Sequence, residues 1–180
     1  MSRFYTGAGD GGRSNMLGKW VIKSSAIIDA IGCVDELNSF IGLAIANIDD
    51  DRIAGMLRQV QNDLFVIGAE LASQINPRFA PNTAIGSVKV KWLEDFIEDL
   101  SKRVPDMKHF VLPGGSLAAS YLHVARAMAR RAERSAVRIK AKRGKPSSIL
   151  PYLNRLSSLL FVTALYMNKK EGVEEENPHY

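Results

Sequence analysis

The chain has 180 residues, of which 46% are hydrophobic and 24% are charged, and its formal net charge at pH 7 is +5. This composition is that of an ordinary globular protein with one domain or two very small ones. The excess of positive charge either indicates an anionic partner, such as a nucleotide, a nucleic acid or an acidic surface, or serves solubility alone. The single cysteine, Cys33, excludes an internal disulfide bond and a zinc cluster built on cysteines.

The sequence carries no sign of a membrane or secretory location. No apolar run reaches the roughly 18 residues of a membrane span, and the N-terminus MSRFYTGAGD lacks the apolar core of a signal peptide. We therefore expect a cytoplasmic protein with no membrane partner. Cys33 lies in an apolar run with helical spacing, where a buried, inert thiol is expected rather than a nucleophile.

Residues 1–24 are rich in glycine and are predicted to form a loop. The small residues of TGAGDGGRS would let backbone N–H groups come close to a ligand, as in loops that bind phosphate. The segment does not match the Walker A pattern, and without a preceding strand it is a poor match to a Rossmann loop. A disordered terminus would have the same composition, so both interpretations stay open.

Apolar residues at steps of three and four predict five helices. Four of them are expected over residues 25–47, 51–74, 86–102 and 149–170. The remaining helix follows the turn Pro113-Gly114-Gly115 and runs to about Arg143, where Gly144-Lys145-Pro146 would end it. No segment is predicted to be a strand. The chain is therefore expected to be an all-α bundle over residues 25–170, with a mobile acidic tail at residues 171–180.

The helix after the Pro-Gly-Gly turn carries arginines at steps of four: Arg126, Arg130 and Arg134. At about 100° per residue they share one face with Glu133 and His123, and the opposite face is apolar. Like charges at this spacing repel mildly, a cost best tolerated where an anion lies against them. Arginine suits phosphate because its planar fork donates two parallel hydrogen bonds. Three arginines over two turns span about 12 Å, comparable to an extended polyphosphate.

Other interpretations of these charges stay open. The arginines could form a surface stripe paired with Glu133, or a basic helix for RNA, although the face lacks the interleaved aromatics of RNA-binding surfaces. Lys19, Lys23 and the pair Asn154-Arg155 could complete an anion-binding set. The sequence has no Glu-x-x-His pair and no G-x-S-x-G motif, which leaves a di-iron centre and a nucleophile elbow unsupported.

Four segments occur in a fixed order: TGAGDGGRS, IGCVDELNSFIGLA, FVLPGGSLAASYLHVARAMARRAER and YLNRLSSLLF. Together, over about residues 5–168, they resemble the PduO-type ATP:cob(I)alamin adenosyltransferases, and R-x-x-x-R-R-A-E-R is the most specific part. The resemblance implies a ferritin-like five-helix bundle that assembles as a homotrimer, with ATP between the N-terminal loop of one subunit and the arginine helix of its neighbour. The implied transferase moves the 5′-deoxyadenosyl group of ATP onto cob(I)alamin and releases triphosphate.

The same resemblance implies roles for particular residues. Arg130 would lie closest to the leaving phosphates, Arg126 would pair with Asp35 across the subunit interface, and Phe110 would displace the lower axial ligand of the corrin. From the residues alone, a core aromatic at a junction between loop and helix is the favoured interpretation of Phe110. The implied ATP-binding positions also include Thr6, Gly7, Gly9, Asp10, Gly12, Ser14, Lys23, Glu133, Arg134 and Asn154. Mg²⁺ would be held through the ATP phosphates rather than by a protein site.

The sequence departs from the family pattern at Ala8 and Ser14, where threonines are usual, and at Ser158, where an aspartate is usual. These departures motivate an alternative, in which an impaired homologue binds ATP or adenosylcobalamin as a chaperone or sensor. The implied partners are other copies of the chain, a reductase that supplies Co(I), and an enzyme that accepts adenosylcobalamin. Nucleic acid is not an expected partner.

Overall fold

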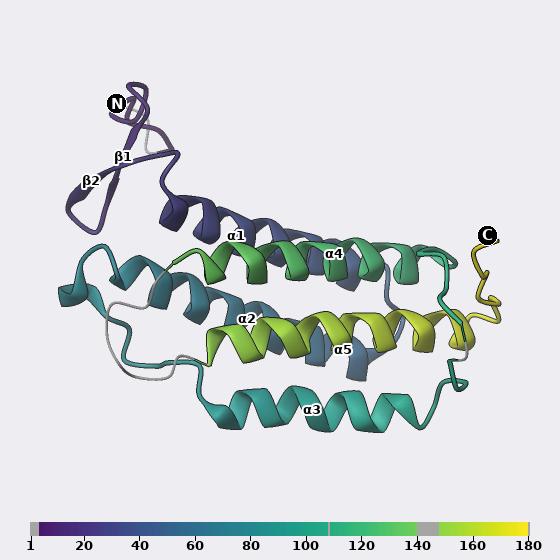
Figure 1. The fold of residues 1–180 in the computed structure, drawn as a ribbon. Helices are drawn as coiled ribbons and strands as arrows, with labels where there is room; N and C mark the ends of the chain where they lie inside the picture. The colour runs from purple at the N-terminus through teal and green to yellow at the C-terminus, as the bar shows by residue number, and fades with distance from the viewer. Residues whose placement is uncertain (1–3, 108, 140–147, 180) are drawn as a thin grey trace.

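The structure is a computed structural model that describes residues 4–107, 109–139 and 148–179. Its helices are α1 (Ala26–Ile45), α2 (Asp51–Ser73), α3 (Ser87–Ser101), α4 (Leu117–Val137) and α5 (Ile149–Lys170), with a short 3-10 turn η1 (Pro77–Phe79). The helices run side by side in one elongated bundle, which confirms the predicted all-α, five-helix class (Figure 1).

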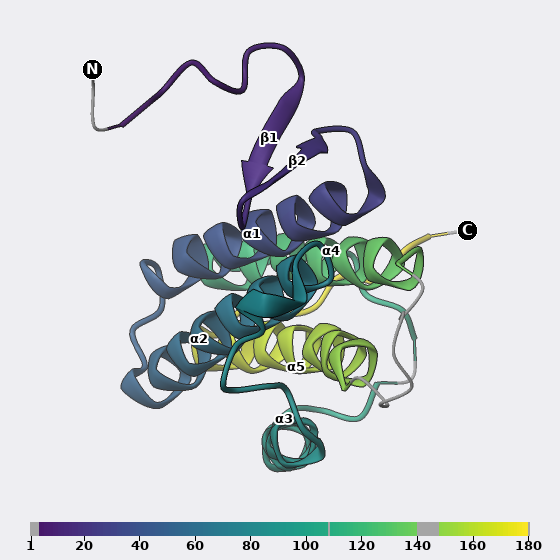
Figure 2. The same cartoon turned by 90° about the vertical axis from the view of Figure 1, so that its left-hand side faces the viewer.

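The order of the helices across the bundle places α4 and α5 at its centre. α4 packs against α1 and α5, while α5 also packs against α3, as the end-on view shows (Figure 2). The buried face of α4 is mostly alanine, which lets its neighbours approach closely; these residues are Ala118, Ala125, Ala129, Ala132 and Ala136. By length and composition α5 could cross a membrane, but most of its side chains are buried within this bundle. Cys33 is buried, as predicted.

The start of α5 is held by a buried carboxylate on α2. Asp63 accepts a hydrogen bond from the Tyr152 hydroxyl at 3.0 Å and an ion pair from Lys89 of α3 at 2.9 Å. Burial and the charge of Asp63 raise the pKa of Tyr152, so its hydroxyl stays a donor. The hydrogen bond and the ion pair thus connect α2, α3 and α5 at Tyr152, two residues before Asn154.

The prediction that the chain has no strand is wrong. β1 (Arg13–Met16) and β2 (Lys19–Ile22) form an antiparallel hairpin in which Met16 pairs with Lys19. The two turn residues both have positive φ, 52° at Leu17 and 76° at Gly18, as the tight hairpin turn requires. These short strands left no signal because neither has a buried face. The hairpin projects from the bundle at the N-terminal end of α1 (Figures 1 and 2).

The predicted end of the arginine helix is also wrong. α4 ends at Val137 with Arg138 as its cap, well before Arg143. Ala136 is its last core side chain, and the following lysines and arginines are good helix formers, so composition did not reveal the end. The expected stop at residues 144–146 lies outside the described residues.

The turn before α4 is held by a buried amide of α5. The Asn168 side chain accepts from the backbone N–H of Ser116 at 2.8 Å and donates to the carbonyl of Gly114 at 3.1 Å. Gly115 has φ of +100°, and a Cβ there would lie 2.3 Å from the Asn168 amide. Only glycine fits this position.

The C-terminal tail returns over the same turn. The backbone N–H of Leu112 donates to the carbonyl of Glu176 at 2.7 Å, and the Glu175 carboxylate accepts from Asn168 at 3.1 Å. The tail therefore lies beside the loop that carries Phe110. The expected mobility of residues 171–180 stays a prediction.

Candidate functional site

The arginines of α4 divide into two groups. α4 and its cap carry Arg126, Arg130, Arg131, Arg134 and Arg138. Arg131 forms an ion pair with Glu36 of α1, and Arg138 lies 3.6 Å from Asp29 of α1. Among the described residues, the other three form no ion pair, and they are the arginine face (Arg126, Arg130 and Arg134). The face predicted from spacing is thus a set of uncompensated cations.

Arg126 is the least solvated member of the arginine face. Its Nε is buried and has no hydrogen-bond partner in the described structure. Burial, followed by the charge of Arg130, lowers the pKa of Arg126 below its ordinary value. A carboxylate or phosphate beside Arg126 would accept the hydrogen bond of its Nε and balance its buried charge.

His123 does not belong to the polar face on which we placed it. Its side chain is only 3% exposed, and its ring lies 6.0 Å from the ring of Phe161 on α5. Neither ring nitrogen of His123 has a hydrogen-bond partner among the residues that the structure describes. Burial, and then the nearby Arg126 charge, lower the pKa of His123 to about 4, so it is neutral at pH 7. Helical spacing missed this because α5, not α4, covers that position.

Two predicted nucleotide-site residues meet at the border of α4 and α5. The Nδ2 of Asn154 donates to the Glu133 carboxylate at 3.1 Å. Arg155, predicted as an anion-binding residue, turns the other way. It donates from its Nη1 to the Oδ1 of Asn154 at 2.6 Å and from its Nε to Glu94 of α3 at 3.0 Å. Sequence analysis missed Glu94, because a charged residue on an outer helix gives no signal of its distant partner.

The N-terminal loop is a series of tight turns. The N–H of Asp10 donates to the carbonyl of Gly7 at 3.2 Å, and the Thr6 hydroxyl accepts from the N–H of Ala8 at 3.3 Å. Gly7 and Gly12 have positive φ, 71° and 77°, which glycine tolerates.

Lys23 closes this loop at the end of β2. Its N–H donates to the carbonyl of Gly12 at 3.0 Å, and its ammonium lies so close to Gly9 that a Cβ would be 3.1 Å from Nζ. Ser14 lies in β1 of the hairpin. The structure therefore brings several of the predicted loop residues together, and Lys23 also lines a cavity with Arg131 and Arg138 of the α4 C-terminal end.

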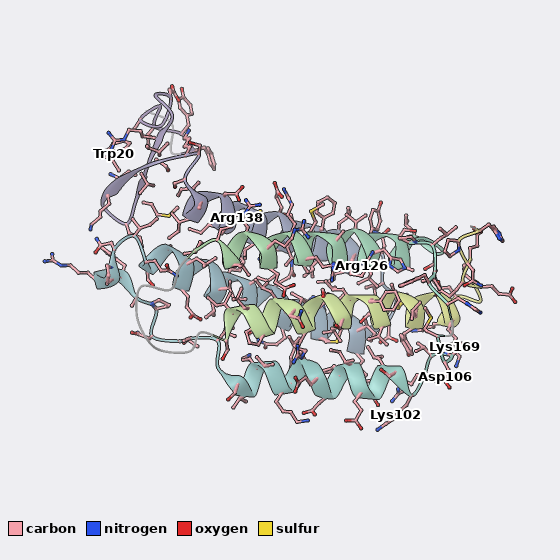
Figure 3. The ribbon with its side chains drawn as sticks, viewed as in Figure 1. Trp20, Lys102, Asp106, Arg126, Arg138 and Lys169 are labelled. Atoms are coloured by element: carbon pink, nitrogen blue, oxygen red, sulfur yellow. The ribbon has the colours of Figure 1, made fainter. Side chains whose placement is uncertain are left out.

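The loop and the arginine face do not meet within one chain. Figure 3 places Trp20 of the hairpin near Arg138, at the C-terminal end of α4, while Arg126 lies about half-way along that helix. Asp35 is exposed on α1 and, among the described residues, forms no ion pair. Its neighbour Glu36 instead pairs with Arg131 of the same chain. The two halves of the predicted site, and the Asp35–Arg126 pair, are thus separate in a single copy.

A cavity of about 540 Å³ lies at the opposite end of the bundle. Its walls come from the loop before α4, the end of α5 and the tail, and are formed in part by Met107, Val111, Leu165 and Val173. Asp106 and Lys169 mark this end in Figure 3. Sequence analysis missed these residues because loop and tail side chains have no periodicity.

Phe110, in the loop that lines this cavity, is not a core residue. Its side chain is 79% exposed, which rules out the core-aromatic interpretation for the single chain. Met107 and Leu112 of the same loop are exposed as well, and a run of exposed apolar side chains is typical of a surface that a ligand or a partner covers.

Three kinds of comparison agree on the relatives of this chain. Residues 4–167 match the family model of cobalamin adenosyltransferase. The corrinoid adenosyltransferase of Mycobacterium tuberculosis (strain H37Rv) is 41% identical over 93% of this chain and 90% of its own length, and that of Bacillus subtilis is 35% identical over 95% and 89%.

Solved structures of a PduO-type ATP:corrinoid adenosyltransferase from Lactobacillus reuteri are also similar. A phenylalanine-to-alanine variant complexed with cobalamin and ATP superposes with a TM-score of 0.91, at 32% identity over 99% of this chain and 100% of that chain. An arginine-to-lysine variant complexed with ATP gives a TM-score of 0.87, at 34% identity over 97% and 99%. With its five-helix bundle, its unpaired arginine face and these relatives, the chain belongs to the cobalamin adenosyltransferase family.

Proposed function

We infer that this chain is an ATP:corrinoid adenosyltransferase, which transfers the 5′-deoxyadenosyl group of ATP to cob(I)alamin. Co(I) supplies the electron pair of the new cobalt–carbon bond to C5′, and the C5′–oxygen bond breaks. Its electron pair leaves with triphosphate. The observation that carries this inference is the arginine face, three cations on α4 that form no ion pair among the described residues.

The protein needs no nucleophile of its own, because the corrinoid supplies it. The remaining tasks are to place C5′ against cobalt and to stabilise negative charge on the leaving triphosphate. Arg130 and Arg134 are exposed, and the planar fork of a guanidinium donates paired hydrogen bonds to phosphate, so they suit the second task. We assign Arg130 to the leaving phosphates and Glu133 with Asn154 to the nucleotide beside them.

We propose that each site is shared between copies of the chain in a homotrimer. The hairpin with Trp20 projects from one end of the bundle while Arg126 lies about half-way along α4 of the same chain, which supports a second copy supplying one of the two. Within the described part of the chain, the buried Nε of Arg126 has no hydrogen-bond partner and the exposed carboxylate of Asp35 forms no ion pair. Pairing them across an interface would satisfy both groups.

The cavity beside Phe110 is the proposed corrinoid side of the site. Its walls include apolar side chains, which suit the face of a corrin ring, and Phe110 lies in the lining loop. An aromatic ring against the lower face of the corrin would exclude an axial ligand there. Four-coordinate cobalt is easier to reduce from Co(II) to Co(I). The electron itself must come from a reductase.

Magnesium fits this site as a companion of the nucleotide. The described residues contain no group of three or more His, Cys, Asp or Glu side chains that could hold a metal ion. Triphosphate oxygens are the hard ligands that Mg²⁺ prefers. We propose that Mg²⁺ arrives on the phosphates and that the arginine face completes their neutralisation in the cytoplasm.

The test is anaerobic mixing of the protein with ATP and chemically reduced cobalamin, following the loss of cob(I)alamin absorbance. We expect one light-sensitive adenosylcobalamin and one triphosphate per turnover. Arg130→Ala should abolish turnover, while Arg52→Ala, which breaks an ion pair with Asp99 between α2 and α3, should retain it.

The alternative function is binding of ATP or adenosylcobalamin by an impaired homologue, as a chaperone or sensor. It is motivated by Ala8, and by Ser158, which is exposed one turn after Asn154 and has no carboxylate to offer. Tight ATP binding by the wild-type chain with no loss of cob(I)alamin absorbance would establish this alternative and refute the transferase.

A further inference from the structure

A chain of three hydrogen bonds crosses the bundle from α4 to α3 through the start of α5. Glu133 of α4 accepts from Asn154, Asn154 accepts from Arg155, and Arg155 donates to Glu94 of α3. The three helices lie side by side with α5 in the middle (Figure 1). We propose that Arg155 and Glu94 are positioning residues, which fix the Asn154 amide and through it Glu133 for nucleotide binding. This proposal rests on the proposed function of the site.

The chemistry of the four groups allows only one orientation of the amide. An arginine can only donate, so the Asn154 atom 2.6 Å from its Nη1 is the carbonyl oxygen. An ionised carboxylate can only accept, so the atom 3.1 Å from Glu133 is the amide nitrogen. A rotation of the amide by 180° would break both contacts at once. Asn154 therefore presents N–H groups to the α4 side of the site.

The geometry of Arg155 explains why an arginine is needed. Its Nε edge meets Glu94 and its Nη1 meets Asn154, so one rigid fork connects two helices. Glu94 holds the guanidinium, and the guanidinium holds the amide. A lysine has a single ammonium at the end of a flexible chain and cannot reproduce both contacts with one fixed plane.

This hydrogen-bond relay (Glu133, Asn154, Arg155 and Glu94) is expected to contribute little to the stability of the fold. An effect of its variants on nucleotide binding can therefore be distinguished from an effect on folding. The Arg155 and Glu94 side chains are 42% and 39% exposed, and ion pairs this accessible are weak in solution. Variants of either residue should therefore fold with an unchanged Tm. An effect on nucleotide binding would then report the orientation of Asn154.

The experiment compares Glu94→Ala and Arg155→Lys with Glu98→Ala. Glu98 lies on the same helix, has an exposed side chain and pairs with Lys102 of that helix at 2.8 Å, so it is a matched control. Isothermal titration with MgATP alone measures the dissociation constant without turnover. The KM values for ATP and cobalamin follow from the anaerobic assay.

We expect Glu94→Ala and Arg155→Lys to weaken ATP binding about fivefold, with the KM for cobalamin and the Tm unchanged, and Glu98→Ala to match the wild type. In an Asn154→Ala background, Glu94→Ala should have no further effect. Unchanged ATP binding in both variants, or the same fivefold loss without Asn154, would overturn the relay. A wild-type chain that binds ATP but never consumes cob(I)alamin would refute the transferase while the titrations still decide the relay.

Discussion

Replacing Gly115 with alanine tests the turn that connects the proposed corrinoid side of the molecule to α4. The new Cβ would lie 2.3 Å from the Asn168 amide, inside any real contact distance, at a φ of +100° that disfavours side chains. The backbone strain costs about 1–2 kcal/mol. Moving the amide away would also break its bonds to the buried N–H of Ser116 and the part-buried carbonyl of Gly114, and such groups left unpaired cost about 1–3 kcal/mol each. The sum is a loss of about 3–8 kcal/mol.

The assay is urea unfolding followed by circular dichroism, at one protein concentration so that assembly does not shift the midpoint. Gly114→Ala is the matched control, because no atom lies within 4 Å of a Cβ there and its φ is not positive. We expect Gly115→Ala to lower the urea midpoint steeply and Gly114→Ala to leave it near the wild-type value. Equal midpoints for the two variants would refute the steric reasoning.

Three further predictions concern the site. Asp35→Ala and Arg126→Ala should each weaken assembly, measured by sedimentation, and raise the KM for ATP about tenfold. The double variant should be no more impaired than either single variant. Additive effects of the two substitutions would exclude the Asp35–Arg126 pair. Because the pKa of His123 falls to about 4 in the folded chain, the unfolded chain binds the extra proton between about pH 6.5 and 4. Neutral His123 therefore contributes fully to the free energy of unfolding above pH 6.5, and this contribution falls by about 2 kcal/mol from pH 7 to pH 4.5. His123→Phe should remove that part of the pH dependence of urea unfolding. Phe110→Ala should leave the Tm unchanged, since the ring is exposed, but should slow adenosylation from cob(II)alamin with a reductant more than from preformed cob(I)alamin; equal slowing of both would place Phe110 outside the reduction step.

The helices could be predicted because their buried faces repeat along the chain. In α2, Ile53, Leu57, Val60, Leu64 and Ile67 are all buried, and steps of four and three among them need no tertiary information. The hairpin was missed for the opposite reason. Trp20 and Ile22 are large apolar residues that stay exposed, so no alternation marks their strand.

At the site, the residue types could be predicted from the sequence, but their contact partners could not. Spacing placed Arg126 and His123 on one face of a helix, but Phe161, 38 positions after His123, buries one of them. Likewise, Arg155 and Glu94 are 61 positions apart, and only the packing of α3 on α5 turns Arg155 away from the arginine face. Residue types and local spacing predicted which chemical groups are present, while tertiary contacts decide which of these groups interact with one another.

Under the proposed sharing of each site between two subunits, the position of the glycine loop has a genetic consequence. When one chain supplies the loop and its neighbour supplies the arginines, two differently broken copies can repair each other. A chain damaged at Gly9 and a chain damaged at Arg130 are each inactive alone. In a mixed assembly, the intact loop of one faces the intact arginine face of the other, and one working site returns. Two recessive alleles of this gene could thus complement each other within a single oligomer, a behaviour closed to enzymes whose sites lie inside one subunit.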